Sequence, residues 1–192
     1  TGIGLLICSI AGYAFVVFPS HGKEILFLAL IASMMVPFAA KIIPMFRMFS
    51  KMGLLNNYLA IILPAIGSPF LIFFFKKNAY SFPKDTLEAA RMDGLNEYQI
   101  FFKIFMPMMK STYAAAGIFM FMASWNNYMW PLIALQSDTK FTLPLVVANL
   151  ASGFTPDYGM TMVGIVLSTL PTIIVFFTLQ KSFVEGMTGS VK

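Results

Sequence analysis

Five long apolar runs alternate with shorter polar segments along this chain of 192 residues. A helix that crosses a membrane needs about 20 predominantly apolar residues, which is close to the length of each run. The pattern predicts an all-α fold, a polytopic membrane helical bundle formed by one domain over residues 1–192. The predicted spans cover about 1–18, 25–46, 55–75, 113–135 and 159–180, and a polar loop, 76–112, separates the third span from the fourth.

Composition indicates that the bilayer is the solvent of this chain. Its residues are 58% hydrophobic and only 11% charged, whereas soluble domains carry about 25% charged residues. The net charge is +5, and a positive net charge is also found in proteins that bind nucleic acid. Here, however, the basic residues form no dense run and lie at the ends of apolar segments, where snorkelling and membrane topology explain them better. We therefore expect no nucleic-acid partner.

The basic residues also predict which side of the membrane each loop faces. If the 76–112 loop is cytoplasmic, nine of the 13 Lys and Arg residues lie inside and four lie outside. This arrangement is favoured because cytoplasmic loops carry the excess of positive charge. The C-terminus is then cytoplasmic, and the segments 47–56 and 136–158 lie outside.

Little in the sequence suggests catalysis or metal binding. The single cysteine, Cys8, lies in an apolar run, the single histidine, His21, lies in a short loop, and the eight carboxylates fall in loops or at the ends of runs. An intramembrane enzyme is an alternative, but it needs acids, bases or metal ligands within the bilayer. A Gly-x-x-x-x-Gly-Lys-Ser/Thr phosphate loop is absent from the sequence. We predict no catalytic, cofactor-binding or metal residue, and no ATP hydrolysis by this chain.

The 76–112 loop contains local signals for two short helices joined by a turn. Pro83 suits the first helical position, where its missing N–H is not needed. Gly94 suits a helix end, because glycine adopts the left-handed conformation easily. Asn96 and Gln99 have the spacing of a capping box at the start of a second helix. We expect that second helix to run up to the membrane and lead into the fourth span.

The same loop carries a spaced motif. Glu88-Ala89-Ala90 is followed after three residues by Gly94, and after nine more by Ile104-Phe105-Met106-Pro107. This spacing resembles the EAA loop by which the membrane subunits of ABC importers dock onto their ATPase, with Met106 where Leu is usual. The resemblance implies ATPase-coupling roles for Glu88, Ala89, Ala90, Asp93, Gly94, Ile104 and Pro107. Small side chains at 89 and 90 would permit close approach of the ATPase. An isolated Glu-Ala-Ala would indicate an ordinary amphipathic loop helix with Glu88 in solvent; the full spacing favours docking.

Other segments resemble the maltose- and lactose-type carbohydrate permeases, in particular the smaller membrane subunit. They are Gly12-Tyr13-Ala14-Phe15 with Pro19 and Gly22-Lys23, Trp125-Asn126-Asn127-Tyr128 with Trp130-Pro131-Leu132, Phe141-Thr142-Leu143-Pro144-Leu145, and the tail from Gln180 to Lys192. The resemblance implies the ABC importer type I permease fold, which has six spans in this subunit. We therefore expect the first span and the start of the second to precede Thr1. The implied location is the inner membrane of a bacterial or archaeal cell.

The resemblance also implies an import complex. A second permease subunit would complete the pore, ABC ATPase subunits would bind ATP and Mg, an extracytoplasmic solute-binding protein would deliver a sugar, and membrane lipid would surround the spans. No cofactor is expected in this chain. A permease for another solute, such as an amino acid or a glycerol phosphate, is the alternative within transport. Anionic solutes would favour basic residues inside the spans, where only Lys41 comes close.

Polar side chains gather in the fourth predicted span, at Ser124, Trp125, Asn126, Asn127 and Tyr128. Polar groups inside spans usually face the bundle interior or a wet cavity, and amides and aromatic faces suit a sugar. We identify these five residues as a candidate substrate path. Two structural alternatives stay open, because asparagine side chains also join helices and aromatic residues also mark the membrane interface.

Overall fold

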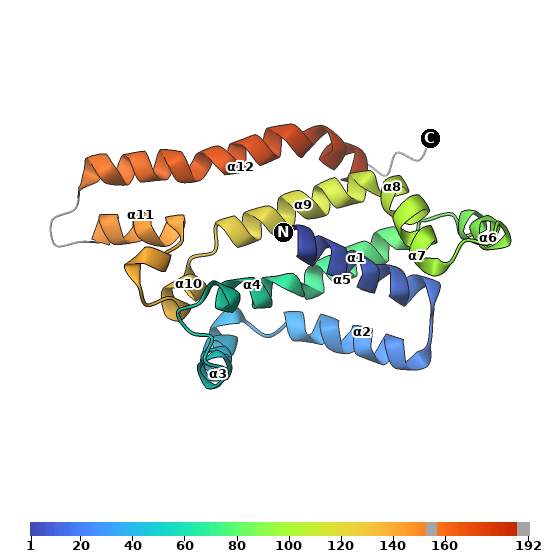
Figure 1. Ribbon diagram of the computed structural model, residues 1–192, viewed down its shortest axis with the longest axis horizontal. Coiled ribbons are helices and arrows are strands. Elements are labelled where there is room, and N and C mark those ends of the chain that lie inside the picture. The colour runs from blue at the N-terminus through green and yellow to red at the C-terminus, as the bar shows by residue number, and fades with distance from the viewer. Residues whose placement is uncertain (153–156, 188–192) are drawn as a thin grey trace. The chain divides into compact units, whose positions relative to one another are not determined.

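Within the residues that the computed structural model describes, 1–152 and 157–187, every regular element is a helix (Figure 1). Side chains are described up to residue 180, so most of the predicted C-terminal tail lies outside the described side chains. The elements are α1 (Gly2–Val17), α2 (His21–Met34), α3 (Phe38–Lys51), α4 (Tyr58–Ile66), α5 (Pro69–Ala79), α6 (Lys84–Met92), α7 (Glu97–Ile100), the π-helix η1 (Phe101–Phe105), α8 (Met106–Met108), α9 (Lys110–Trp125), α10 (Met129–Ala134), the 3-10 helix η2 (Asp138–Lys140), α11 (Leu143–Ser152) and α12 (Tyr158–Met187). The expected all-α class is confirmed.

Two helical segments among the described residues are long and apolar enough to cross a membrane alone. They are Tyr58–Ala79, which joins α4 and α5, and Tyr158–Gln180 in α12. Two broken pairs, α2 with α3 and α7–α8 with α9, also qualify if each pair is counted as one span. The apolar helix α1 is shorter. The structure thus contains two to four candidate spans, and the arrangement in five stays a prediction.

Three of the predicted spans are divided in the structure, and the run 55–75 has only a short gap, at residues 67–68 between α4 and α5. The run 25–46 divides into α2 and α3 at residues 35–37. Pro37 explains this break, because proline disfavours the helical conformation of the preceding residue and cannot donate a helical hydrogen bond. The run 113–135 divides into α9 and α10 at residues 126–128. Asn126 and Asn127 favour this break, because asparagine has a low helix propensity.

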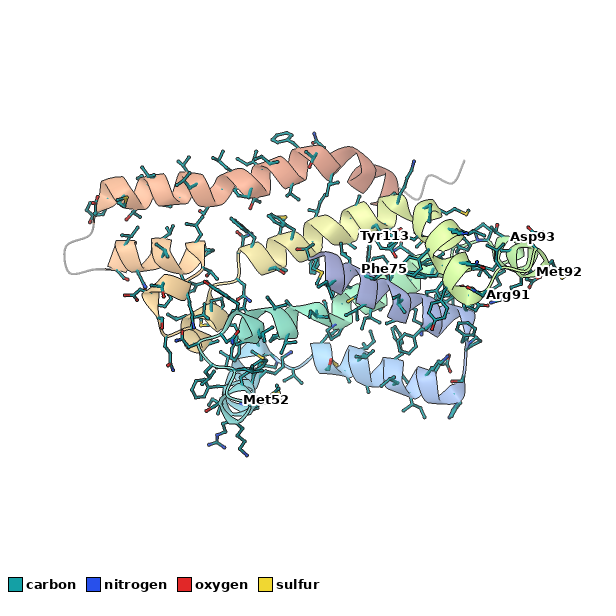
Figure 2. The ribbon with its side chains drawn as sticks, viewed as in Figure 1. Met52, Phe75, Arg91, Met92, Asp93 and Tyr113 are labelled. Atoms are coloured by element: carbon teal, nitrogen blue, oxygen red, sulfur yellow. The ribbon has the colours of Figure 1, made fainter. Side chains whose placement is uncertain are left out.

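The described residues form two compact units, the first of which holds α1, α2 and the elements from α5 to most of α9. In this unit α1 packs along α5 (Figure 1). One part of the core consists of Cys8, Leu71, Phe75, Ala116 and Met120. The rings of Phe75 and Tyr113 lie against each other with centroids 4.9 Å apart (Figure 2). These contacts hold α1, α5 and α9 together.

Helix α1 approaches α5 very closely at Gly12. A Cβ atom at this position would lie 2.6 Å from the Phe75 Cβ and 2.9 Å from the backbone nitrogen of Lys76. Both distances are shorter than van der Waals contact, so only glycine allows the two helices to approach this closely. Such small-residue contacts are a common means of helix association in membranes.

The second unit comprises residues 36–65 and 121–178, of which 153–156 are outside the description. Its core includes Phe49, Ala60, Trp130 and Ala134. The Trp130 indole N–H donates a 2.8 Å hydrogen bond to the carbonyl oxygen of Ala60, and its ring meets that of Phe49 edge to face, with centroids 5.6 Å apart. Trp130 therefore joins α10 to α4 and α3.

Asn56 organises the segment that follows α10. Its backbone has a φ of 55°, in the left-handed region, which asparagine tolerates better than most residues. Its Oδ1 atom accepts the N–H groups of Gln136 (3.2 Å) and Ser137 (3.1 Å), and its Nδ2 donates to Ser137 Oγ (2.7 Å). Its carbonyl oxygen accepts a hydrogen bond from Lys140 Nζ at 2.6 Å. One residue thus fastens the 135–140 segment to the loop between α3 and α4.

We expect Asn56→Ala to release the 135–140 segment. The substitution removes three side-chain hydrogen bonds. It also places alanine in the left-handed region, a backbone conformation that costs about 1–2 kcal/mol for such a residue. Limited proteolysis of the purified protein should then cut this segment several times faster than in the wild type. The matched control is Asn57→Ala, because the Asn57 side chain accepts a hydrogen bond only from the nearby N–H of Leu59. Equal cleavage of the two variants would contradict the expectation.

Candidate coupling site

The start of α6 differs slightly from the sequence prediction. Pro83 lies at the N-cap, one residue before the helix, with an extended ψ of 115°. It was expected as the first helical residue; because its backbone is still extended there, the helix begins at Lys84. Asp85 lies in the first turn, where a carboxylate interacts favourably with the positive end of the helix dipole.

The end of α6 at Gly94 confirms the predicted turn. Gly94 has a φ of +79°, its N–H donates to the carbonyl oxygen of Arg91 at 3.0 Å, and the N–H of Leu95 donates to that of Ala90 at 3.1 Å. These two bonds form a Schellman motif, which satisfies carbonyl groups that would otherwise be unpaired at a helix end. Leu95 also packs against the cluster that contains Ala90. The direction of the chain after α6 is thereby fixed.

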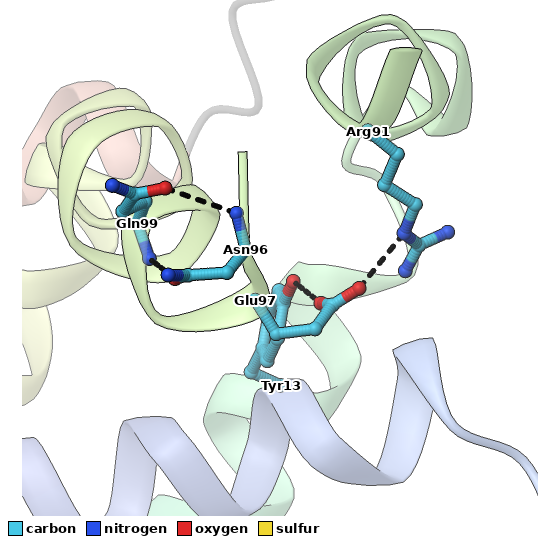
Figure 3. Close-up of polar contacts among 5 residues, drawn as sticks. All are labelled: Tyr13, Arg91, Asn96, Glu97 and Gln99. Carbon is cyan, nitrogen blue, oxygen red and sulfur yellow. Dashed lines mark hydrogen bonds and ion pairs between the residues drawn. The ribbon is translucent and has the colours of Figure 1, made fainter. Parts of the chain in front are cut away.

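The second helix begins with the predicted capping box. Asn96 Oδ1 accepts the N–H of Gln99 at 2.9 Å, and Gln99 Oε1 accepts the N–H of Asn96 at 3.0 Å (Figure 3). Beyond this start, the expectation of a helix running into the fourth span is corrected. The chain passes through the π-helix η1 and α8, and then bends by 81° at Met109 into α9. Pro107 contributes to this irregularity, because it cannot donate an N–H to the helical turn before it.

The two faces of α6 have different roles. Leu87 and Ala90 are buried in a cluster with Tyr13, Phe82, Ile100, Phe101 and Phe105. The opposite side, which we call the coupling face, consists of Glu88, Ala89, Met92 and Asp93, all of them exposed. Met92 is 88% exposed, and Figure 2 shows Met92 and Asp93 at the far end of the helix.

The structure brings only some of the predicted coupling residues together. Glu88, Ala89 and Asp93 share the coupling face, with Gly94 directly after it. Ala90, at 3% exposure, faces the chain's own core, so its small size serves internal packing rather than the approach of an ATPase. Ile104 is half-buried in η1, and Pro107 is exposed in α8. Both belong to the segment that supports α6.

Glu97 connects three helices through charged hydrogen bonds that the sequence analysis did not find. Arg91 Nε donates to Glu97 Oε1 at 2.8 Å, and the Tyr13 hydroxyl donates to Glu97 Oε2 at 3.0 Å (Figure 3). The hydrogen bond from Arg91 holds the pKa of the Glu97 carboxyl below its usual value. Glu97 and Arg91 lie on opposite sides of the Gly94 turn, and Tyr13 is 84 residues away, so no periodic pattern marks the three as neighbours.

A cavity of about 210 Å³ lies beside the coupling face. Its walls come from the ends of α1 and α5, from α6, and from Phe105 of η1. Most of the lining is apolar, with contributions from Val16, Val17, Pro19, Ala79, Phe82 and Leu87, and its charged members are Lys84, Glu88 and Arg91. The cavity can accept an apolar side chain of a partner protein, and its charged members can contact charged residues next to that side chain.

The candidate substrate path lies in the second unit, at the break between α9 and α10. Trp125 ends α9, donates its indole N–H to the carbonyl oxygen of Ser168 in α12 at 2.9 Å, and stacks on Phe121. Its polar atom therefore serves helix packing. Ser124, Asn126 and Tyr128 are exposed and Asn127 is half-buried, so these four side chains are not enclosed by the packing of this chain.

Comparison with known proteins assigns the chain to a family. Residues 4–189 match the family model described as "Binding-protein-dependent transport system inner membrane component". The lactose transport system permease protein LacG of Rhizobium radiobacter is 50% identical over 192 residues, which cover 100% of this chain and 70% of that protein. The arabinooligosaccharides transport system permease protein AraQ of Bacillus subtilis (strain 168) is 40% identical over 193 residues, covering 100% and 69%.

A solved structure is also similar. It is the crystal structure of a bacterial ABC transporter involved in the import of the acidic polysaccharide alginate, with a TM-score of 0.84 and 26% identity over 95% of this chain and 70% of that chain. Together these matches confirm an inner membrane location and a transport role rather than an enzymatic one. A transport system of this kind includes an ATPase, a binding protein and a partner permease. The chain therefore belongs to the family of inner membrane components of binding-protein-dependent transport systems.

Proposed function

We propose that this permease imports a sugar, and that the coupling face of α6 is its contact with the ATPase. Two relatives that are 50% and 40% identical over the whole chain carry names that specify lactose and arabinooligosaccharides. The similar solved structure belongs to a transporter of a polysaccharide. The cargo is thus a disaccharide or a short oligosaccharide. The 76–112 loop faces the cytoplasm, since this orientation places nine of 13 basic residues inside.

The observation that carries the coupling role is a stiff helix with an exposed, partly apolar face. A Schellman motif ends α6, its inner side is packed through Leu87 and Ala90, and Met92 projects almost fully into solvent. A mostly apolar cavity lined in part by Leu87, Glu88 and Arg91 of the same helix adjoins this face, and an apolar surface rimmed by charged residues is typical of a protein contact. Because the C-terminal end of α6 is fixed by this motif and its inner side is packed, a force applied to the coupling face moves the helix as a unit.

Two neighbouring cysteine variants test this contact. Ala89 is exposed on the coupling face, whereas Ala90 is buried. In the assembled transporter, Ala89→Cys carrying a thiol-linked photoreactive reagent should cross-link to the ATPase subunit, and Ala90→Cys should not. The only natural cysteine, Cys8, is fully buried and gives a low background. Absence of the Ala89→Cys cross-link, or labelling of Ala89→Cys from outside intact cells, would refute the assignment.

The break between α9 and α10 is proposed as part of the sugar path. Non-helical backbone within a membrane is tolerated where it lines a cavity or is covered by protein, and interrupted helices often form substrate sites in transporters. Here the interruption carries exposed Ser124, Asn126 and Tyr128. Amide and hydroxyl groups at such a position suit the hydroxyl groups of a passing sugar.

We expect Asn126→Ala to change the uptake of one sugar more than that of another. A lost hydrogen bond affects sugars differently when their hydroxyl groups meet the amide differently, and a typical effect is about 1 kcal/mol or fivefold. Uptake of labelled lactose and of an arabinooligosaccharide by the reconstituted transporter measures this ratio. The control is Asn149→Ala, an exposed asparagine in α11. Equal losses for both sugars would instead indicate a role in helix packing.

A further inference from the structure

The carboxylate of Glu97 is the point at which the coupling helix meets α1. One oxygen accepts from Arg91 in the last turn of α6, and the other accepts from the hydroxyl of Tyr13 in α1. Glu97 itself is the first residue of α7, directly after the capping residue Asn96. The neighbouring helices α6 and α7 and the remote helix α1 therefore share one charged group. No other salt bridge occurs among the described side chains.

Tyr13 cannot move independently of the elements around it. Its side chain is 4% exposed, and its ring lies edge to face against Phe101 (centroids 5.3 Å apart) and Phe105 (4.8 Å) of η1. The preceding residue, Gly12, is pressed against Phe75 of α5. The hydroxyl is thus held at the end of a rigid ring on a closely packed helix. A displacement of Glu97 has to move α1 or break the hydrogen bond.

We propose that Glu97 is a positioning residue through which motion of α6 is passed to α1. This inference rests on the proposed function, because it assumes that the ATPase acts on the coupling face. Arg91 connects Glu97 to α6, and Tyr13 connects it to α1. The apolar contacts of Leu87 and Ala90 keep the two helices close together. The charged hydrogen bonds add a directional connection to this packing, since apolar contacts are much less directional than hydrogen bonds.

Single-atom substitutions separate this role from ordinary stabilisation. Tyr13→Phe removes one hydroxyl and keeps the ring contacts with Phe101 and Phe105. Glu97→Gln removes the charge that pairs with Arg91 and keeps the size of the side chain. The matched control is Tyr98→Phe, which removes a hydroxyl from the next residue, where the side chain is 80% exposed.

The experiment measures ATP hydrolysis and sugar uptake in the same proteoliposomes, which contain the full transporter with its ATPase, partner permease and binding protein. Tyr13→Phe and Glu97→Gln should assemble normally and hydrolyse ATP, while the sugar imported per ATP falls at least threefold. Tyr98→Phe should keep the wild-type ratio. The double variant should be no worse than the more impaired single variant, because both act on one connection.

Two outcomes would overturn the inference. One is a wild-type ratio of sugar to ATP in Tyr13→Phe; the other is a parallel fall of hydrolysis, uptake and complex yield, which indicates a purely structural role. The cross-link from Ala89→Cys separates the failure of the Glu97 role from the failure of the ATPase contact at the coupling face. If Ala89→Cys reaches the ATPase and Tyr13→Phe is fully coupled, only the role of Glu97 fails. If the cross-link is absent, the coupling assignment itself fails.

Discussion

Gly94→Val should reduce ATP-driven uptake at least about fivefold while the protein remains in the membrane at normal levels. Gly94 has a φ of +79°, and a Cβ atom there would meet nothing within 4 Å. The effect is therefore one of backbone conformation alone. A β-branched residue in this region costs about 1–3 kcal/mol, which is enough to shift a conformational equilibrium by roughly 5- to 150-fold. The Schellman motif would open, and α6 would lose its fixed angle to α7.

The matched control for this prediction is Gly94→Asn. Asparagine tolerates the left-handed conformation at helix ends, and the open space around position 94 accepts its side chain. Gly94→Asn should therefore keep most of the uptake. Uptake and ATP hydrolysis in proteoliposomes measure both variants. Similar uptake by the valine and asparagine variants would show that the backbone conformation at Gly94 does not matter for coupling.

Gly12→Ala should destabilise the first unit strongly, although alanine is the better helix former by about 1 kcal/mol. The added methyl would lie 2.6 Å from the Phe75 Cβ and 2.9 Å from the backbone nitrogen of Lys76. A side-chain end could move aside, but a helix backbone cannot, so α1 and α5 have to separate. Overpacking of this kind costs about 1–3 kcal/mol and occasionally more. Thermal unfolding of the purified protein in detergent should show a lower transition temperature and a lower yield of monodisperse protein.

Gly117→Ala is the control in the same unit. A Cβ atom there would lie 3.7 Å from Leu5 Cδ1, an ordinary contact. The alanine should be neutral or stabilising through its helix propensity. If the two alanine variants unfold at the same temperature, the close contact of α1 with α5 contributes nothing to stability.

The features that sequence analysis predicted best are those that depend on near neighbours. The turn at Gly94 and the capping box at Asn96 and Gln99 are decided within a few residues, and the structure contains both. The long apolar runs likewise indicate helices directly. The family resemblance, based on spaced motifs, is confirmed by matches that cover almost the whole chain.

Two of the three features that were missed depend on contacts between segments. Hydrophobicity alone did not show that the fourth predicted span breaks at Asn126, because the residues on both sides are apolar. Ala90 was assigned to the coupling surface by its motif, yet its side chain is buried, and only the packing of α6 reveals which face is inward. The contact of Tyr13 with Glu97 joins residues that no local pattern relates. All three features become visible only in the folded structure.

The π-helix from Phe101 to Phe105 places a limit on changes of loop length in evolution and in design. In η1 the N–H of Met106 bonds to the carbonyl oxygen of Phe101, five residues back, instead of the four of an α-helix. Deleting one residue would let a regular α-helix form, but each residue of such a helix turns the chain by about 100°. The α6–α7 hairpin would then point in another direction. Homologues and engineered variants should therefore keep the number of residues between Gly94 and Pro107, even where their identities change.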